Sequence, residues 1–213
     1  MSTVDPNTVS LFRDSEYIPA HYWDELAGLE RLEVCKRASV TFEQEQGFII
    51  PFLERRYFCQ PQLRRILRED RPEKPLSFQE YLVILLYLLG AKECLPEGRK
   101  ISEKELPGGE LFFRGPHALL TEPLEKKFGR DPQGFLRAGL QLNGRETGRG
   151  EASFELLVLP KIPLEYILYC EDEEFSAQVT INFDRTISRH LAMDAIWALV
   201  NLTSRRLASF TEE

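Results

Sequence analysis

The pattern of apolar and polar residues predicts one buried helix in the middle of the chain. Residues 81–89 are nine apolar residues in a row, and Ser77 and Glu80 precede them at the spacing of a capping box. Gly90 follows, and glycine favours the left-handed position at a helix C-terminus. A helix that is apolar all round is typical of a protein core, and this run is far shorter than the roughly 20 residues that span a bilayer. We therefore predict a buried helix over about 77–89 and no membrane span.

Other stretches have the spacing of shorter helices. Apolar residues recur at helical intervals in residues 18–29 and 190–207. Residues 118–128 predict a helix that is regular only after Pro123, and Asp131 followed by proline predicts the start of another helix over 131–140. The C-terminal helix over about 190–207 is the longest of this group.

Runs rich in β-forming residues alternate with turn residues elsewhere. Residues 38–42 and 48–53 predict a hairpin, and residues 55–59 a further short strand. Pro51 indicates an edge strand or a bulge, because proline donates no ladder hydrogen bond. Three later runs, 154–159, 164–169 and 177–183, predict an antiparallel meander.

Together these elements predict an α+β fold. We expect an antiparallel sheet, made of the hairpin plus the meander, packed with several helices that include the buried apolar helix and the C-terminal helix. Neither an internal repeat nor a long linker divides the sequence. We therefore expect a single domain over 17–213 and a loosely held tail at 1–16.

Composition places the chain among ordinary globular proteins. Its 213 residues are 43% hydrophobic and 29% charged, enough for one substantial core. The net charge of −7 argues against nucleic-acid binding, which needs a basic surface. The N-terminal residues lack a signal-peptide pattern, and the four cysteines lack paired spacing. We expect an acidic, soluble, cytoplasmic protein with reduced thiols.

Two charged segments have a plain and a functional interpretation. Residues 54–74 hold seven basic and four acidic residues, and they could form a solvated face or a docking patch. Four acids in a row at 171–174 lack the oxygen spacing of a calcium loop, and a solvated turn between strands explains them better. We favour the plain interpretation of both segments.

The sequence shows no recognisable catalytic or cofactor motif. Neither a nucleophile elbow, a phosphate-binding loop nor a dinucleotide fingerprint is present, so the catalytic residues and the cofactor stay unknown. His190 and Asp194 are four residues apart on the predicted C-terminal helix. Such a pair is more often a local hydrogen bond or a helix cap than a metal site, so we predict no metal.

The most unusual segment is the glycine- and proline-rich loop over 106–117. It carries Glu110, Phe113, Arg114 and His117, which could receive an anionic or planar ligand. In the plainer interpretation, the phenylalanines fill the core, Arg114 pairs with an acid and His117 caps the next helix. Both interpretations stay open, and we favour the plainer one.

Several motifs in order resemble a bacterial and archaeal family described only as domain of unknown function 3786. They are residues 77–91 (SFQEYLVILLYLLGA), 105–109 (ELPGG), 123–129 (PLEKKFG), 159–163 (LPKIP), 172–175 (DEEF) and 182–184 (NFD). The resemblance spans roughly residues 25–207. It implies no established activity to carry across. Some relatives look as though they join this domain to a cysteine-rich segment of iron–sulfur type, which this chain lacks.

Our leading hypothesis is a non-enzymatic accessory protein that binds a partner protein or a small ligand, linked by family analogy alone to redox or cofactor metabolism. The alternative is an enzyme whose pocket is built around Arg114 and His117, with an acid such as Glu110 or Asp184. A third hypothesis is a homo-oligomeric scaffold that uses exposed aromatic residues, namely Tyr17, Tyr22 and Trp23. We expect neither nucleic acid nor membrane as a partner.

Overall fold

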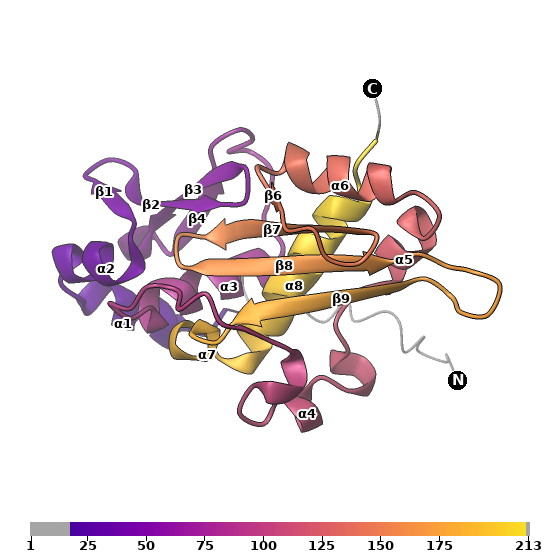
Figure 1. Cartoon of the computed structure of the whole chain (residues 1–213). Helices are drawn as coiled ribbons and strands as arrows, with labels where there is room; N and C mark the ends of the chain where they lie inside the picture. Colours follow the sequence, from indigo (N-terminus) through magenta and orange to yellow (C-terminus); the bar gives the residue numbers. More distant parts are fainter. Residues whose placement is uncertain (1–17, 212–213) are drawn as a thin grey trace, which may run out of the picture.

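The fold belongs to the predicted α+β class. The structure is a computed structural model that describes residues 18–211, so the predicted tail at 1–16 and Tyr17 lie outside the described residues. Within that range the hairpin and the meander form two separate antiparallel sheets rather than one (Figure 1). No helix among the described residues has the length and the apolar composition to cross a bilayer.

The first half of the chain builds two short helices, the smaller sheet and the long apolar helix. The sheet has the strand order β1-β2-β3-β4. The elements are α1 (Ala20–Gly28), α2 (Arg31–Ala38), β1 (Thr41–Glu43), β2 (Gly47–Phe52), β3 (Arg55–Gln60), a 3-10 turn η2 (Pro61–Leu63), β4 (Arg65–Arg68) and α3 (Phe78–Gly90).

The second half builds a five-stranded sheet and the helices that cover one of its faces. The strand order is β5-β9-β8-β7-β6. The elements are β5 (Lys100–Ile101), η3 (Glu103–Glu105), α4 (Gly109–Phe112), η4 (Gly115–His117), α5 (Glu122–Phe128), α6 (Pro132–Gln141), β6 (Arg145–Glu146), β7 (Ala152–Leu159), β8 (Ile162–Tyr169), β9 (Gln178–Asp184), α7 (Ile187–His190) and α8 (Met193–Ala208).

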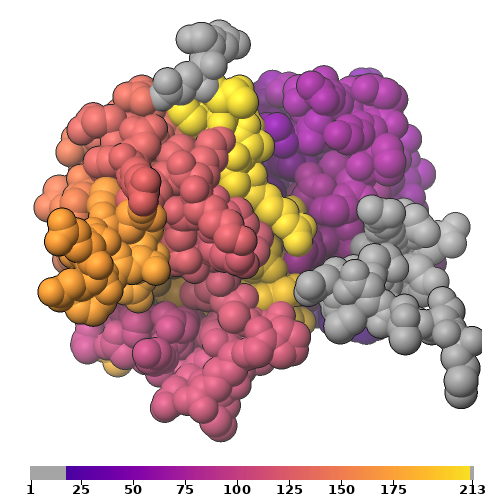
Figure 2. Space-filling view, turned by 90° about the vertical axis from the view of Figure 1, so that its right-hand side faces the viewer, coloured from indigo at the N-terminus to yellow at the C-terminus, as the bar shows by residue number. Residues whose placement is uncertain are grey.

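Helix α8 lies at the centre of the molecule. It packs against α3 and α5 and runs behind β7, β8 and β9 (Figure 1). In Figure 2 it appears as a yellow band between the violet first half and the orange-to-red second half. Strand β2 also touches β7, and the backbone N–H of Leu53 donates to the carbonyl of Val158 at 2.9 Å. The two halves therefore share one continuous core.

The apolar helix α3 forms as predicted. The Ser77 hydroxyl accepts the backbone N–H of Glu80, and the Glu80 carboxylate accepts the backbone N–H of Ser77 at 2.8 Å. Gly90 differs from the prediction, because it is the last helical residue and does not take a left-handed conformation. A Cβ at this position would lie 2.7 Å from the carbonyl oxygen of His190. Gly90 is thus suited to close packing of α7 rather than to a left-handed cap.

Several predicted elements need correction. Helix α2 falls partly where the first strand was expected, and that strand begins at Thr41. The C-terminal helix begins at Met193, because Leu191 and Ala192 are extended and separate it from α7. His190 and Asp194 therefore lie on different helices, so they do not share the face that was predicted for them. Trp23 is buried rather than exposed, because it packs edge-on against Tyr81.

The position of Pro51 shows why a proline is tolerated in β2. This strand is an inner strand, since it pairs with both β1 and β3. However, β1 pairs only with Gly47–Ile49, so Pro51 lies beyond its end and opposite Arg56 of β3. The chain around Pro51 is therefore an edge locally, although the strand as a whole is not.

Candidate functional site

The loop over 106–117 folds into α4 and η4, on a segment that projects from the body of the molecule (Figure 1). Glu110 and Arg114 are both exposed and form an ion pair with each other, with 2.9 Å between Oε1 and Nη2. Phe113 turns inward and is buried. Arg114 therefore faces solvent, whereas Phe113 of the same predicted site packs into the core.

His117 lies in an aromatic cluster. Its ring stacks on Phe112 with 4.7 Å between centroids, and Trp197 of α8 meets it edge-on at 5.6 Å. His117 is exposed, and the N-cap position of the next helix, α5, belongs to Thr121. His117 therefore contacts Phe112 and Trp197. Arg114 and Glu110 pair with each other instead of with His117.

Asp184, the other acid considered for this loop, is buried and fully engaged. Its carboxylate accepts the backbone N–H groups of Glu97, Gly98 and Thr186 and the hydroxyl of Thr186, at 2.7–3.1 Å. Burial raises the pKa of this carboxyl, but the Thr186 and backbone hydrogen bonds outweigh it, so the pKa is lowered. Asp184 holds the segment over 97–98 against the end of β9.

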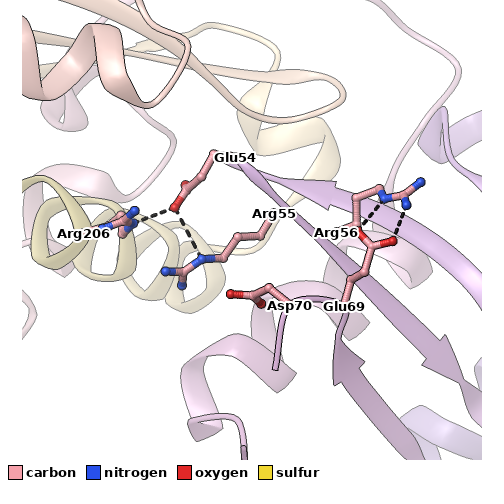
Figure 3. Close-up of a pocket in the computed structure, with 6 residues that line it drawn as sticks. All are labelled: Glu54, Arg55, Arg56, Glu69, Asp70 and Arg206. Atoms are coloured by element: carbon pink, nitrogen blue, oxygen red, sulfur yellow. Dashed lines mark hydrogen bonds and ion pairs between the residues drawn. The ribbon is translucent and has the colours of Figure 1, made fainter. Parts of the chain in front are cut away.

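A hollow of about 540 Å³ lies elsewhere, where the tip of the β2–β3 hairpin meets the end of α8 (Figure 3). We call it the arginine hollow. All of its lining residues are charged: Glu54, Arg55, Arg56, Glu69, Asp70 and Arg206. Three segments that are distant in the sequence supply them, namely the hairpin, the turn after β4 and the last turn of α8.

Glu54 is the centre of the arginine hollow. Its Oε1 accepts the Nε–H of Arg206 at 2.6 Å and lies 3.3 Å from Nε of Arg55 (Figure 3). Its Oε2 is buried and has no hydrogen-bond partner among the described residues. Two guanidinium groups therefore converge on a single oxygen, and the other oxygen contributes no bond.

The backbone beside Glu54 is strained. Leu53 has φ = +53°, a left-handed conformation that is unfavourable for a bulky side chain. The hydrogen bond from its N–H to Val158 helps to hold this conformation. Strain of this kind costs on the order of 1–3 kcal/mol and is enriched at functional sites. Leu53 directly precedes Glu54 in the turn between β2 and β3.

The other carboxylates of the arginine hollow are occupied by their own arginines. Arg56 contacts Glu69 through both Nε and Nη2, and Nε of Arg68 donates to Asp70 at 2.5 Å. The hydrogen bond from Arg56 lowers the pKa of Glu69. Burial raises the pKa of Asp70, but the hydrogen bond and charge of Arg68 outweigh it and lower the pKa. Both acids are therefore charged at neutral pH.

Tyr57 of β3 follows Arg55 and Arg56 in the chain and connects this strand to α3. The Tyr57 hydroxyl donates to Glu80 Oε1 at 2.9 Å, and Glu80 is also the capping residue of that helix. Burial and the nearby Glu80 charge raise the pKa of Tyr57. The Tyr57 hydroxyl is thus a neutral hydrogen-bond donor.

The lining residues of the arginine hollow are suited to charge-assisted hydrogen bonds. Arginine is suited to bind carboxylate or phosphate groups through two N–H donors at once. A metal is not what these residues suggest, since each carboxylate already accepts from a guanidinium. No group of three His, Cys, Asp or Glu side chains within residues 18–211 is arranged to hold a metal ion.

The sequence contained one signal for this site. The basic segment over 54–74 supplies five of the six lining residues, all except Arg206, and we favoured its interpretation as a solvated face. The contribution of Arg206 could not be seen, because nothing in the sequence places the last turn of α8 beside the hairpin. The four residues predicted at 110–117 line no part of the arginine hollow.

Comparison with known proteins identifies the family of this chain. The comparison with curated proteins finds no match, and the comparison with solved structures finds none either. A family model matches residues 31–206, which is most of the chain and agrees with the resemblance of its motifs. The chain therefore belongs to the family described as Domain of unknown function (DUF3786).

Proposed function

We propose that this protein is a non-enzymatic binding protein whose arginine hollow takes a small ligand with a carboxylate or phosphate group. The observation that carries the proposal is the convergence of Arg55 and Arg206 on one oxygen of Glu54. Since two cations share a single acceptor atom, the attraction of a further anion to the pair is only partly cancelled.

The hydrogen-bond inventory supports an anion rather than a cation. Within residues 18–211, Nη1 and Nη2 of Arg55 and Nη2 of Arg206 have no acceptor. Both side chains are about one-third exposed, 30% and 32%, so a ligand can reach them. Unused donors beside the opening favour a ligand that brings acceptors.

The lining also limits the kind of ligand. A volume of about 540 Å³ is in the usual range for small-molecule sites, but those sites are mostly apolar and this one is charged throughout. An apolar body would gain little here. We therefore expect a compact, highly polar ligand, free or at the end of a partner's side chain.

The accessory role and the cellular setting are part of the same proposal. Four free cysteines are described, and such thiols fit a reducing cytoplasmic environment. The link to redox or cofactor metabolism rests on the family resemblance alone.

Titration calorimetry at low ionic strength tests the proposal, with inorganic phosphate and citrate as separate probes. We expect at least one probe to bind, and Arg55→Gln and Arg206→Gln each to weaken that binding about tenfold or more. Arg130→Gln is the matched control, because Arg130 is an exposed arginine that pairs with Glu171 away from the hollow. No binding of either probe, or equal binding by all four proteins, would refute the proposal.

A second candidate is a ligand or enzyme site at the 106–117 loop, favoured by one observation. His117 lies between Phe112 and Trp197, an arrangement that suits a planar ligand. If the loop is such a site, His117→Ala leaves the free energy of unfolding nearly unchanged, because the ring is exposed. A urea titration measures this, and a loss of several kcal/mol would mark His117 as a structural residue instead.

A further inference from the structure

A second cluster, away from the arginine hollow, pairs a cysteine with a buried histidine. Cys94 lies in the connection after α3 and is partly exposed, and its Sγ is 3.4 Å from Nε2 of His190. His190 is at the end of α7 and only 1% exposed. The two residues come from distant parts of the sequence, so the fold itself assembles this pair.

The surroundings fix the proton of His190 on the nitrogen that faces the sulfur. Nδ1 accepts the backbone N–H of Lys92 at 3.2 Å, so it cannot carry a proton of its own. The neutral ring must therefore hold its proton on Nε2 and donate it toward Cys94. In this arrangement His190 cannot take a proton from the thiol. It can stabilise a negative charge on the sulfur.

Nearby positive charges also keep the His190 ring neutral. Lys161 is buried, and its ammonium donates to the carbonyls of Arg37 and Lys92, at 2.7 and 2.8 Å. Burial, followed by the charges of Lys161, Arg189 and Lys92, lowers the pKa of His190 to about 4, against a smaller opposite effect of Asp184. The histidine thus stays neutral near pH 7 and keeps its Nε2–H directed at the Cys94 sulfur.

The surroundings of the other three cysteines disfavour a thiolate. Cys59 is fully buried, and burial raises its pKa. Burial and Glu30 raise the pKa of Cys35, and burial together with three nearby acids raises the pKa of Cys170. A thiolate is favoured by cations and hydrogen-bond donors and disfavoured by burial and acids.

We propose that Cys94 is the reactive thiol of this protein, a nucleophile that hydroperoxides oxidise to sulfenic acid, with the Nε2–H of His190 positioned to hold the sulfur anion. In this step the thiolate attacks the terminal oxygen of the peroxide. The S–O bond forms as the O–O bond breaks, and the leaving hydroxide or alkoxide takes a proton from water. The sulfur loses two electrons, and the peroxide gains them. The proposal is independent of the arginine hollow.

The first test compares the four cysteines with one another in the wild-type protein. A short pulse of iodoacetamide is applied to the native protein and to the protein in urea, and peptide mass spectrometry gives the labelling rate at each cysteine. We expect Cys94 to react about tenfold faster than Cys35 and Cys170 in the native protein, and all four to react alike in urea. Equal native rates, or a faster Cys170, would refute the proposal.

The second test examines the oxidant and the histidine. Hydrogen peroxide is added with a sulfenic-acid trap, and we expect the trap on Cys94 before any other cysteine. We expect His190→Ala to slow labelling of Cys94 about tenfold and His190→Gln to keep part of the rate, because the Gln amide also donates an N–H. Thermal melts check that the variants fold. If they do not, the wild-type comparison still decides. Selective alkylation without peroxide oxidation would overturn the oxidant class.

Discussion

At the scale of single residues, this protein places charge in its interior and satisfies it with backbone groups. Lys161 and Arg37 are buried, and both donate to carbonyl oxygens rather than to acids. Carbonyl groups at the ends of helices carry partial negative charge, so they stabilise such cations. Asp184 is the converse case, since it accepts only from N–H and O–H groups. These contacts hold the connection after α3 against the rest of the fold.

His190 makes stability depend on pH at this scale. Its pKa is about 4 in the folded protein and ordinarily 6.5, so the unfolded chain binds a proton between these values and the folded protein does not. The stabilising contribution is therefore complete above pH 6.5 and is lost as the pH falls toward 4. We expect the free energy of unfolding to fall by about 2 kcal/mol as the pH is lowered from 6.5 to 5.

Urea titrations at several pH values measure this dependence. His190→Gln should remove most of the slope in that window, while the exposed His117→Gln should keep it. A wild-type stability that stays flat from pH 6.5 to 5 would contradict the assignment of a neutral, buried His190.

At the scale of elements, capping at helix ends and close packing between elements determine which substitutions the fold tolerates. Glu80 accepts from Ser77 at the start of α3 and from Tyr57 of β3, so a single side chain joins the helix to the smaller sheet. Close packing is illustrated by helix α6, which lies against β7.

We expect Ser77→Ala to lower the free energy of unfolding by about 1 kcal/mol through the lost cap. Glu80→Ala should cost more, because it also leaves the Tyr57 hydroxyl without its acceptor. Chemical denaturation of the two variants measures the difference. If the order were reversed, the link from Glu80 to the sheet would not contribute to stability.

Two helical glycines should respond in opposite ways to the same substitution. A Cβ at Gly139 of α6 would lie 2.3 Å from the ring of Phe154, so Gly139→Ala should destabilise the protein by about 1–3 kcal/mol. A Cβ at Gly28 of α1 meets nothing within 4 Å, so Gly28→Ala should be neutral or slightly stabilising. Thermal melts of both variants test this pair, and a harmless Gly139→Ala would show that α6 can move away from β7.

The sequence predicted elements best where local signals agree. Helix α3 had a capping box and an unbroken apolar run, and the strands of the meander had proline or acidic corners. Helix α2 was missed because Leu32 faces solvent and Arg37 is buried, which reverses the usual amphipathic pattern. The break between α7 and α8 was missed because neither glycine nor proline marks it.

At the scale of the whole molecule, α8 joins the two halves into one core. The arginine hollow and the Cys94–His190 pair both depend on this assembly, since each combines residues from distant segments. The candidate site could not be derived from the sequence for that reason. Local patterns predict elements, but they do not state which turn of α8 meets which hairpin.

The shared core predicts cooperative unfolding of a single domain. The chain has two tryptophans. Trp23 lies in α1 of the first half, and Trp197 of α8 contacts Ala118 and His117 of the second half. We expect Trp23→Phe and Trp197→Phe, each of which leaves one tryptophan, to show a fluorescence transition that coincides with circular dichroism in urea. Separate midpoints for the two probes within either variant would indicate two domains.

The position of Arg206 has a consequence for protein synthesis. Glu54 and Arg55 leave the ribosome well before Arg206, which lies far downstream of them in the chain. The two arginines therefore converge only after α8 has been translated and has docked against the hairpin. A nascent chain that stops short of α8 lacks one of the two convergent cations, so the proposed ligand recognition would distinguish chains that include α8 from chains that stop before it.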